Sequence, residues 1–205
     1  MEQRSQEAEK AYDRLGNGYN FLTKLADKMV LNRAAKVLIS QNALGSVLEV
    51  GVGTGKNLHH YPEGCDIVGI DISTNALQKA EAEAVRCGAR FNAQVGDIAS
   101  IPFDKGHFDT VVMTLVACQL DDPLTVFREM RRVCKPDGRV LFLEHFPPKT
   151  LGMKALFTAT WPLARLAINC RPFSDNASLI GESGLKELER EHYASGALQT
   201  IVTQP

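Results

Sequence analysis

Short apolar runs along residues 46–145 alternate with stretches in which apolar residues recur every three or four positions. The short runs predict strands, and the wider spacing predicts helices. The predicted strands are 46–50, 65–71, 89–95, 108–114 and 139–146, with helices at 74–87 and 121–134. This alternation predicts a doubly wound, Rossmann-like α/β sheet.

The two ends of the chain have other patterns. Residues 1–45 carry apolar positions at helical steps and predict helix, with a break at the glycines of 16–18. Two short strands, near 187–193 and 197–203, close the chain. Because no repeat and no second domain is visible, we divide the chain into an N-terminal helical segment, 1–45, and a core, 46–205. The core carries a basic amphipathic insertion at 146–173.

Local signals mark the ends of three of these elements. Ser73 stands where its hydroxyl can cap the helix at 74–87. Pro123 falls in the first turn of the next helix, where its missing N–H is tolerated. The sequence KPDG, residues 135–138, predicts a turn before the fifth strand.

Polar and flexible residues gather where the predicted strands end. In doubly wound sheets, ligands bind beyond the carboxyl ends of the central strands. The segments at these ends are 49–55, Asp71, Asp97, 114–119 and 144–145. We therefore expect a ligand site along this edge.

Composition narrows the class of protein. The chain has 205 residues, 44% of them hydrophobic, which suits one globular domain. Its 23 basic and 24 acidic residues do not form the excess positive charge of a nucleic-acid binder. The five cysteines form no CxxC pair, which favours reduced thiols. No signal core or membrane-spanning run is visible, so we expect a cytoplasmic protein that at most binds the inner surface of the cell membrane. We also expect it to be a monomer.

Three alternating glycines follow the first strand in the sequence VLEVGVGTGKN. They are Gly51, Gly53 and Gly55, and Glu49 precedes them inside the strand. A dinucleotide fingerprint would need a glycine in place of Lys56, and the phosphate-loop pattern does not fit either. An acid before the first glycine disfavours a pyrophosphate and suits a cationic ligand.

Two further acids define the rest of that ligand. Asp71, twenty residues after Gly51, stands where a carboxylate accepts the ribose hydroxyls of a nucleoside. Asp97 can accept from an adenine amine while Ile98 packs against the ring. Together these residues suit S-adenosylmethionine, a cationic, phosphate-free adenosine ligand. The alternative is an ordinary tight turn with acids that cap helices.

The successive motifs VLEVGVGTGKNLHHYP, VGIDIS, VGDIASIPF, FDTVVMT and MRRVCKPDGRVLFLEHF resemble those of class I S-adenosylmethionine-dependent methyltransferases. The resemblance implies a seven-stranded sheet of order 3-2-1-4-5-7-6 with the last strand antiparallel. The N-terminal helical segment is expected to form a lid and a second membrane contact, and its alternative is an ordinary solvated helix face. The resemblance also implies S-adenosylhomocysteine as the product. The cofactor residues it implies are Glu49, Gly51, Gly53, Gly55, Asp71, Ile72, Asp97, Ile98, Thr114 and Leu115.

Motifs outside this core resemble two groups of the class. YDRLGNGYN is similar to the branch of ubiquinone/menaquinone C-methyltransferases and bacterial phospholipid N-methyltransferases. LEHF, ATWPLARLAINCRPF and GALQTIVTQP resemble the bacterial phosphatidylethanolamine N-methyltransferases, although INC departs from their pattern. This resemblance implies methylation of a lipid amine toward phosphatidylcholine.

The segment 146–173 supports a lipid substrate on its own composition. It contains no acid, and its four basic residues give a local charge of +4 among aromatic and aliphatic residues. That composition is typical of a helix in an anionic membrane interface. The residues expected to bind the lipid or the membrane are Lys154, Trp161, Arg165 and Arg171. The alternative is a cover helix packed on the core.

Candidate catalytic residues lie at both ends of the chain. Tyr19, with Tyr12 nearby on the helix, could cover the methyl group and contact the amine. His145 could accept a proton at the end of the fifth strand. Each could instead be an ordinary packing residue. No metal-ligand spacing is visible, so no metal is expected. The rival functions are methylation of a quinone carbon or a thiol, and cofactor binding without catalysis.

Overall fold

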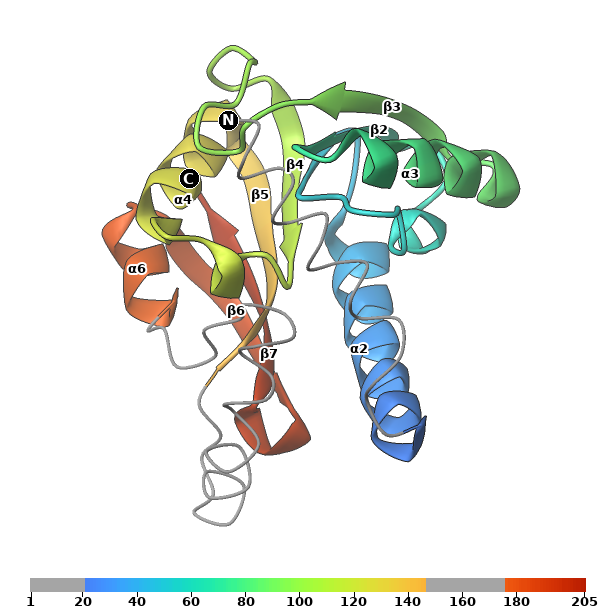
Figure 1. The fold of residues 1–205 in the computed structure, drawn as a ribbon. Coiled ribbons are helices and arrows are strands. Elements are labelled where there is room, and N and C mark those ends of the chain that lie inside the picture. Colours follow the sequence, from blue (N-terminus) through green and yellow to red (C-terminus); the bar gives the residue numbers. More distant parts are fainter. Residues whose placement is uncertain (1–20, 147–175) are drawn as a thin grey trace.

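The computed structural model describes residues 21–146 and 176–205, with side chains described from residue 29 onward. The element bounds follow in chain order (Figure 1). They are α2 Phe21–Asn42, β1 Ser46–Val50, η1 Leu58–His60, β2 Asp66–Asp71, α3 Thr74–Cys87, β3 Arg90–Val95, β4 Phe108–Thr114, η2 Ala117–Gln119, α4 Pro123–Val133, β5 Cys134–His145, α6 Asn176–Glu182, β6 Lys186–Tyr193, η3 Ala194–Gly196 and β7 Leu198–Gln204.

One sheet organises the molecule. Its seven strands follow the order β3-β2-β1-β4-β5-β7-β6. The first five strands of this order pair in parallel, whereas β7 is antiparallel to both β5 and β6. The predicted class, strand order and antiparallel last strand are therefore confirmed.

Helices cover both faces of the sheet and bury a core on each. Helices α4 and α6 lie on one face, where Phe127 meets Phe142 edge-on at a centroid distance of 5.1 Å. On the other face, α2 contributes Ile39 and α3 contributes Ala80 to a second apolar cluster. Central strands such as β4 are apolar on both faces because both are covered.

Two predicted helix starts are confirmed in detail. The Ser73 hydroxyl accepts a hydrogen bond from Ala76 N at the start of α3. At the start of α4, Asp122 is the N-cap, and Pro123 occupies the first turn. These caps place the segments before both helices at the carboxyl edge of the sheet.

The KPDG segment differs from the predicted simple turn. Residues 135–138 are included in β5, but the pairing with β4 skips from Cys134 directly to Arg139. Lys135 anchors the irregularity, because its ammonium binds Asp109 at 2.5 Å. The four residues therefore form a bulge inside the strand.

Parts of the predicted N-terminal segment and of the insertion lie outside the described residues. Helix α2 confirms the helix prediction from residue 21 to residue 42. Residues 1–20 and 147–175 carry the remaining predictions for these two segments, and their roles as lid and membrane contact stay predictions.

Candidate functional site

The glycine turn lies between β1 and η1 at the carboxyl edge of the sheet. Gly51, Gly53 and Gly55 adopt φ values of 70°, 53° and 75°, which L side chains rarely adopt. A Cβ atom on Gly51 would stand 2.6 Å from Val116 Cγ2, and one on Gly55 would stand 2.9 Å from Ala80 Cα. Glycine is required here because the turn bends sharply against two neighbouring elements.

Asp71 ties this turn to the start of α3. Its Oδ2 accepts a hydrogen bond from Gly53 N, and its Oδ1 accepts one from Ser73 N, both at 2.9 Å. Ile72 beside it is 40% exposed. Asp71 thus holds the glycine turn directly, in addition to the ribose contact that the sequence predicts for it. The N-cap of α3 is Ser73, so the bond from Ser73 N to Asp71 lies before the helix and Asp71 itself does not cap it.

A buried hydrogen-bonded network surrounds Glu49. Its Oε1 accepts a bond of 2.7 Å from Asn57 Nδ2, and its Oε2 accepts one of 2.9 Å from the Tyr61 hydroxyl. Asn57 Nδ2 also donates to Thr114 Oγ1 at 2.8 Å, which connects the turn to the end of β4. Glu49 is 1% exposed. The network therefore holds a carboxyl group of defined orientation below the turn.

Burial sets the ionisation of this network. It raises the pKa of Glu49 to about 7, against the opposing effect of the hydrogen bonds from Asn57 and Tyr61. Burial also raises the pKa of the Tyr61 hydroxyl well above its usual value. Ionising a buried carboxyl group is costly unless a positive charge lies beside it. The Glu49 carboxyl group therefore favours a cationic ligand. Asn57 and Tyr61 were not predicted as site residues, and their closeness to Glu49 in the chain was the available signal.

The ends of β4 and β5 complete this edge. Leu115 has a positive φ of 57°, and its N–H donates to Leu143 O. In the next turn, Val116 N and Ala117 N donate to Glu144 Oε1 at 2.9 and 3.0 Å. Glu144 is fully buried, which raises its pKa to about 7. Glu144 thereby supports the turn that carries the Val116 side chain against Gly51.

His145 shares a face of the sheet with Glu49. Glu49 pairs with Val112, and Thr114, two residues further along β4, pairs with Leu143, two residues before His145. Because side chains alternate along strands, Glu49, Thr114 and His145 point to the same side. This is the side covered by α2.

Asp97 and Ile98 lie in the segment that follows β3. Asp97 is exposed and accepts a hydrogen bond from Ala99 N, whereas Ile98 is partly buried against the core. Gly96 N donates to Asp71 O at 3.1 Å, which joins this segment to the end of β2. The structure therefore brings the three predicted acids to one edge, on β1, β2 and the segment after β3.

Six predicted residues lie outside the described part of the chain. They are Tyr12, Tyr19, Lys154, Trp161, Arg165 and Arg171. Among the described residues, no group of three or more acidic, histidine or cysteine side chains could hold a metal ion. Nor does any described helix have the length and apolar character needed to cross a membrane.

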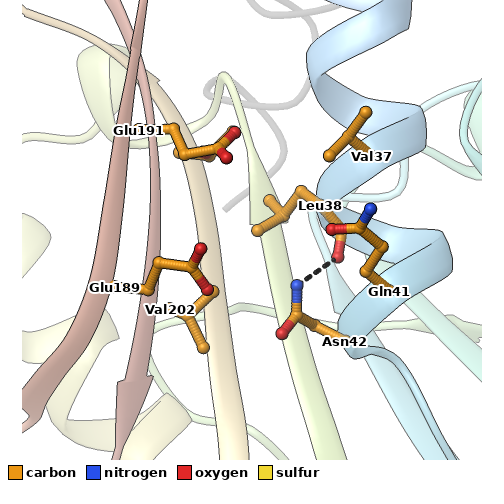
Figure 2. A pocket seen from close by; sticks show the side chains of 8 residues that line it. Val37, Leu38, Gln41, Asn42, Glu189, Glu191 and Val202 are labelled. Atoms are coloured by element: carbon orange, nitrogen blue, oxygen red, sulfur yellow. Dashed lines mark hydrogen bonds between the residues drawn. The ribbon is translucent and has the colours of Figure 1, made fainter.

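A small pocket lies elsewhere, between α2 and the β6–β7 hairpin. Figure 2 shows Val37 and Leu38 of α2 opposite Glu189 and Glu191 of β6. Asn42 Nδ2 donates to Leu38 O across one end of it. None of the predicted cofactor residues lines this pocket.

The described residues fit S-adenosylmethionine. The glycine turn provides the close backbone approach, Glu49 a buried acid for a cation, and Asp71 a carboxylate for the ribose. Asp97 and Ile98 offer one polar and one apolar contact for adenine. Carboxylates accept hydrogen bonds and favour a positive charge, as the hydroxyl, amine and sulfonium groups of this ligand require.

Comparison with known proteins finds a family that matches the part of the chain carrying this edge. Residues 48–142 match the family described as a methyltransferase domain. The chain is 28% identical over 167 residues to the ubiquinone/menaquinone biosynthesis C-methyltransferase UbiE of Geotalea uraniireducens. The aligned region covers 77% of the chain and 71% of that relative.

Two further relatives match shorter regions. The phosphatidylethanolamine N-methyltransferase of Cereibacter sphaeroides is 36% identical over 104 residues, covering 50% of the chain and 51% of that relative. The human thiol S-methyltransferase TMT1A is 39% identical over 104 residues, covering 49% and 42%. The chain therefore spans about half the length, or less, of these two relatives.

The fold also matches solved structures. A geranyl diphosphate methyltransferase in complex with SAM superposes with a TM-score of 0.68 at 15% identity, covering 94% of each chain. At this identity the likeness concerns the fold alone. The relatives named above act on three different kinds of acceptor, as their names state.

Proposed function

Because the chain contains a class I S-adenosylmethionine-dependent methyltransferase domain, we propose that it transfers methyl groups to the amine of a membrane phospholipid. The proposed acceptors are phosphatidylethanolamine and its partly methylated forms. The observation that carries this proposal is the 36% identity to the Cereibacter phosphatidylethanolamine N-methyltransferase. The basic, aromatic composition of residues 146–173 supports the same acceptor.

Each described residue at the edge has a proposed part in holding the cofactor. Glu49 lies at the methionine end, where its carboxylate favours the positive charge. Asp71 accepts from the ribose, and Asp97 with Ile98 contacts adenine. When bound, S-adenosylmethionine supplies an activated methyl group, so the protein mainly aligns the acceptor and excludes water.

The acceptor amine must lose a proton before it attacks. His145 lies at the end of β5, on the face that Glu49 and Thr114 share. We assign it the role of contacting the amine or accepting its proton. Tyr19 and Tyr12 are proposed to cover the methyl group and to bind the methylated head group through their ring faces.

Vesicles of defined composition test the acceptor. We expect methyl-labelled S-adenosylmethionine to label the lipid fraction of phosphatidylethanolamine vesicles that also contain an anionic lipid. Phosphatidylcholine vesicles with the same anionic lipid are the control, because their head group is already fully methylated. An Asp71→Ala preparation controls for contaminating activity. Label that appears on a quinone or a thiol, and not on lipid, would reject the phospholipid assignment.

The ring-carbon alternative has one specific observation in its favour. The UbiE match covers 77% of the chain, compared with 50% for the phospholipid enzyme. A carbon acceptor would need a base for a ring or phenol proton, and His145 could supply it. The same assay with a demethylquinone in neutral vesicles separates the two reactions.

We expect the basic residues of the insertion to contribute to vesicle binding. Changing both Lys154 and Arg165 to Glu reverses two charges, and each basic residue contributes about 1 kcal/mol near an anionic surface. Sedimentation with anionic vesicles should fall at least tenfold, while cofactor affinity stays unchanged. The double variant Arg86→Glu and Arg90→Glu, at two exposed positions elsewhere, is the matched control. Equal sedimentation of the variant and the unmodified protein would favour a cover helix.

A further inference from the structure

The segment between β3 and β4, residues 96–107, has no regular secondary structure along the part that carries Asp97 and Ile98. Backbone N–H and C=O groups in such a segment need partners from elsewhere in the protein. Some partners are local: Ser100 N donates to Asp97 O, and Phe103 N donates to Ile101 O. The remaining partners show what holds this segment in place.

Two side chains of α4 supply those partners. Arg132 donates from Nη1 to Phe103 O and from Nη2 to Ile101 O, both at 2.8 Å. Glu129 Oε2 accepts from Ile101 N at 3.0 Å. Both backbone polar groups of Ile101 and the carbonyl of Phe103 are therefore bound by one arginine and one glutamate.

The two side chains also hold each other. Arg132 Nε donates to Glu129 Oε1 at 2.7 Å, and Nη2 donates to Glu129 Oε2 at 2.8 Å. The Arg132 guanidinium lowers the pKa of the Glu129 carboxyl, which keeps the pair ionised. A guanidinium orients several donors in one plane, so the pair acts as a rigid clamp.

The clamp lies a few residues along the chain from Asp97 and Ile98, which are proposed to contact adenine. Ile101 is 3% exposed and belongs to the core, and Ile98, three residues earlier, packs against the same cluster. The main chain continues past the clamp, where Gly106 N donates to Arg132 O and His107 N to Val133 O. Only four residues, 97–100, separate Gly96, which is bound to Asp71 O, from the clamp at Ile101.

We propose that Arg132 and Glu129 are positioning residues for the adenine end of the cofactor site. They set the position of Asp97 and Ile98 by binding the backbone a few residues further on. This inference rests on the proposed placement of adenine, and it is independent of the acceptor substrate. Neither side chain is assigned a contact with the cofactor.

Calorimetry with two ligands tests the proposal. S-adenosylhomocysteine has the adenine amine, and S-inosylhomocysteine has an oxygen in its place. The unmodified protein should prefer the first at least tenfold, because Asp97 accepts from the amine and repels an oxygen. In Arg132→Ala this preference should fall to about threefold or less, with weaker binding of S-adenosylhomocysteine. A ratio of affinities measured on one sample does not depend on the fraction of folded protein.

An arginine–glutamate pair on α3 provides the matched control. Arg86 binds Glu83 at the same three-residue spacing, and the helix surface around it is exposed. Arg86→Ala should therefore leave both affinities unchanged. Arg132→Lys should lie between the alanine variant and the unmodified protein, because one ammonium group cannot reproduce the planar set of donors. If Arg132→Ala does not fold, Arg132→Lys and Glu129→Gln carry the same comparison.

The outcomes separate this inference from the proposed cofactor site. An unchanged preference in the Arg132 and Glu129 variants would overturn the positioning role, and so would an equal loss for both ligands. Failure of the unmodified protein to bind S-adenosylhomocysteine would overturn the cofactor site and this inference together. The calorimetry does not measure phospholipid methylation. If the protein did not methylate phospholipid, the result for Arg132 and Glu129 would still hold.

Discussion

Replacing Asp71 with alanine should abolish measurable binding of S-adenosylhomocysteine. The change removes the proposed acceptor for the ribose hydroxyls and the acceptor for Gly53 N and Ser73 N. Hydrogen bonds to a charged group contribute about 1.5–3 kcal/mol each, so the loss should be at least a hundredfold in the dissociation constant. Titration calorimetry of the purified variant measures it.

Asp66, at the opposite end of the same strand, is the control for this prediction. Its carboxylate pairs with Arg90, and both side chains are about two-thirds exposed, at 66% and 68%. Exposed pairs of this kind contribute little, so Asp66→Ala should bind like the unmodified protein. Asp71→Asn should be intermediate, because one carbonyl oxygen remains as an acceptor. Binding of full strength by Asp71→Ala would contradict the assigned site.

The affinity for S-adenosylmethionine should rise with pH through neutrality because of Glu49. Burial raises the pKa of Glu49 to about 7 in the free protein, and a bound cation favours the carboxylate. If only the ionised form binds well, affinity should increase about tenfold between pH 6 and pH 8. Calorimetry in two buffers of different ionisation enthalpy should show proton release near pH 7.

Two variants isolate the contribution of Glu49. The side chain in Glu49→Gln cannot ionise. Because both proteins bind the same ligand, dividing their affinities at each pH cancels the titration of the ligand itself. Tyr61→Phe removes a hydrogen bond that lowers the pKa of Glu49, and it should move the midpoint to higher pH. A pH dependence of equal slope in Glu49→Gln would show that another group is responsible.

The same shift affects the stability of the free protein. In the unfolded chain Glu49 has its ordinary pKa of 4.5, and in the fold the pKa is raised to about 7. The protonated form is therefore favoured by folding. The stabilisation is complete below pH 4.5 and is lost as the pH rises through about 7. Glu144, whose pKa burial also raises to about 7, acts in the same direction.

Much of the fold could be predicted from local patterns. The apolar centre of β4, residues 111–113, was visible as a short run, and Ser73 and Pro123 marked helix starts that the structure confirms. The strand order followed from the resemblance to the methyltransferase class. The bulge at 135–138 was predicted as a turn because its local composition is the same, and only pairing with β4 distinguishes the two.

The candidate site was predictable in part for a similar reason. Glu49, Asp71 and Asp97 stand at strand ends, and parallel strands bring their carboxyl ends to one edge. The functions of Asp71 as a brace for Gly53, and of Glu144 as a brace for Val116 and Ala117, were not visible. Those contacts join segments from different strands, so they depend on how the ends are arranged in space.

The order of helices and strands could be predicted from the sequence, and so could the placement of three acids beyond a glycine turn. These features are local, because side-chain period and turn chemistry are encoded within a few neighbouring residues. Which side chains contact one another depends on how the elements pack in the folded protein. Burial of Glu49 and the hold of Arg132 on Ile101, 31 residues away, arise only when separate elements pack together, because packing excludes water and brings distant groups within hydrogen-bonding distance.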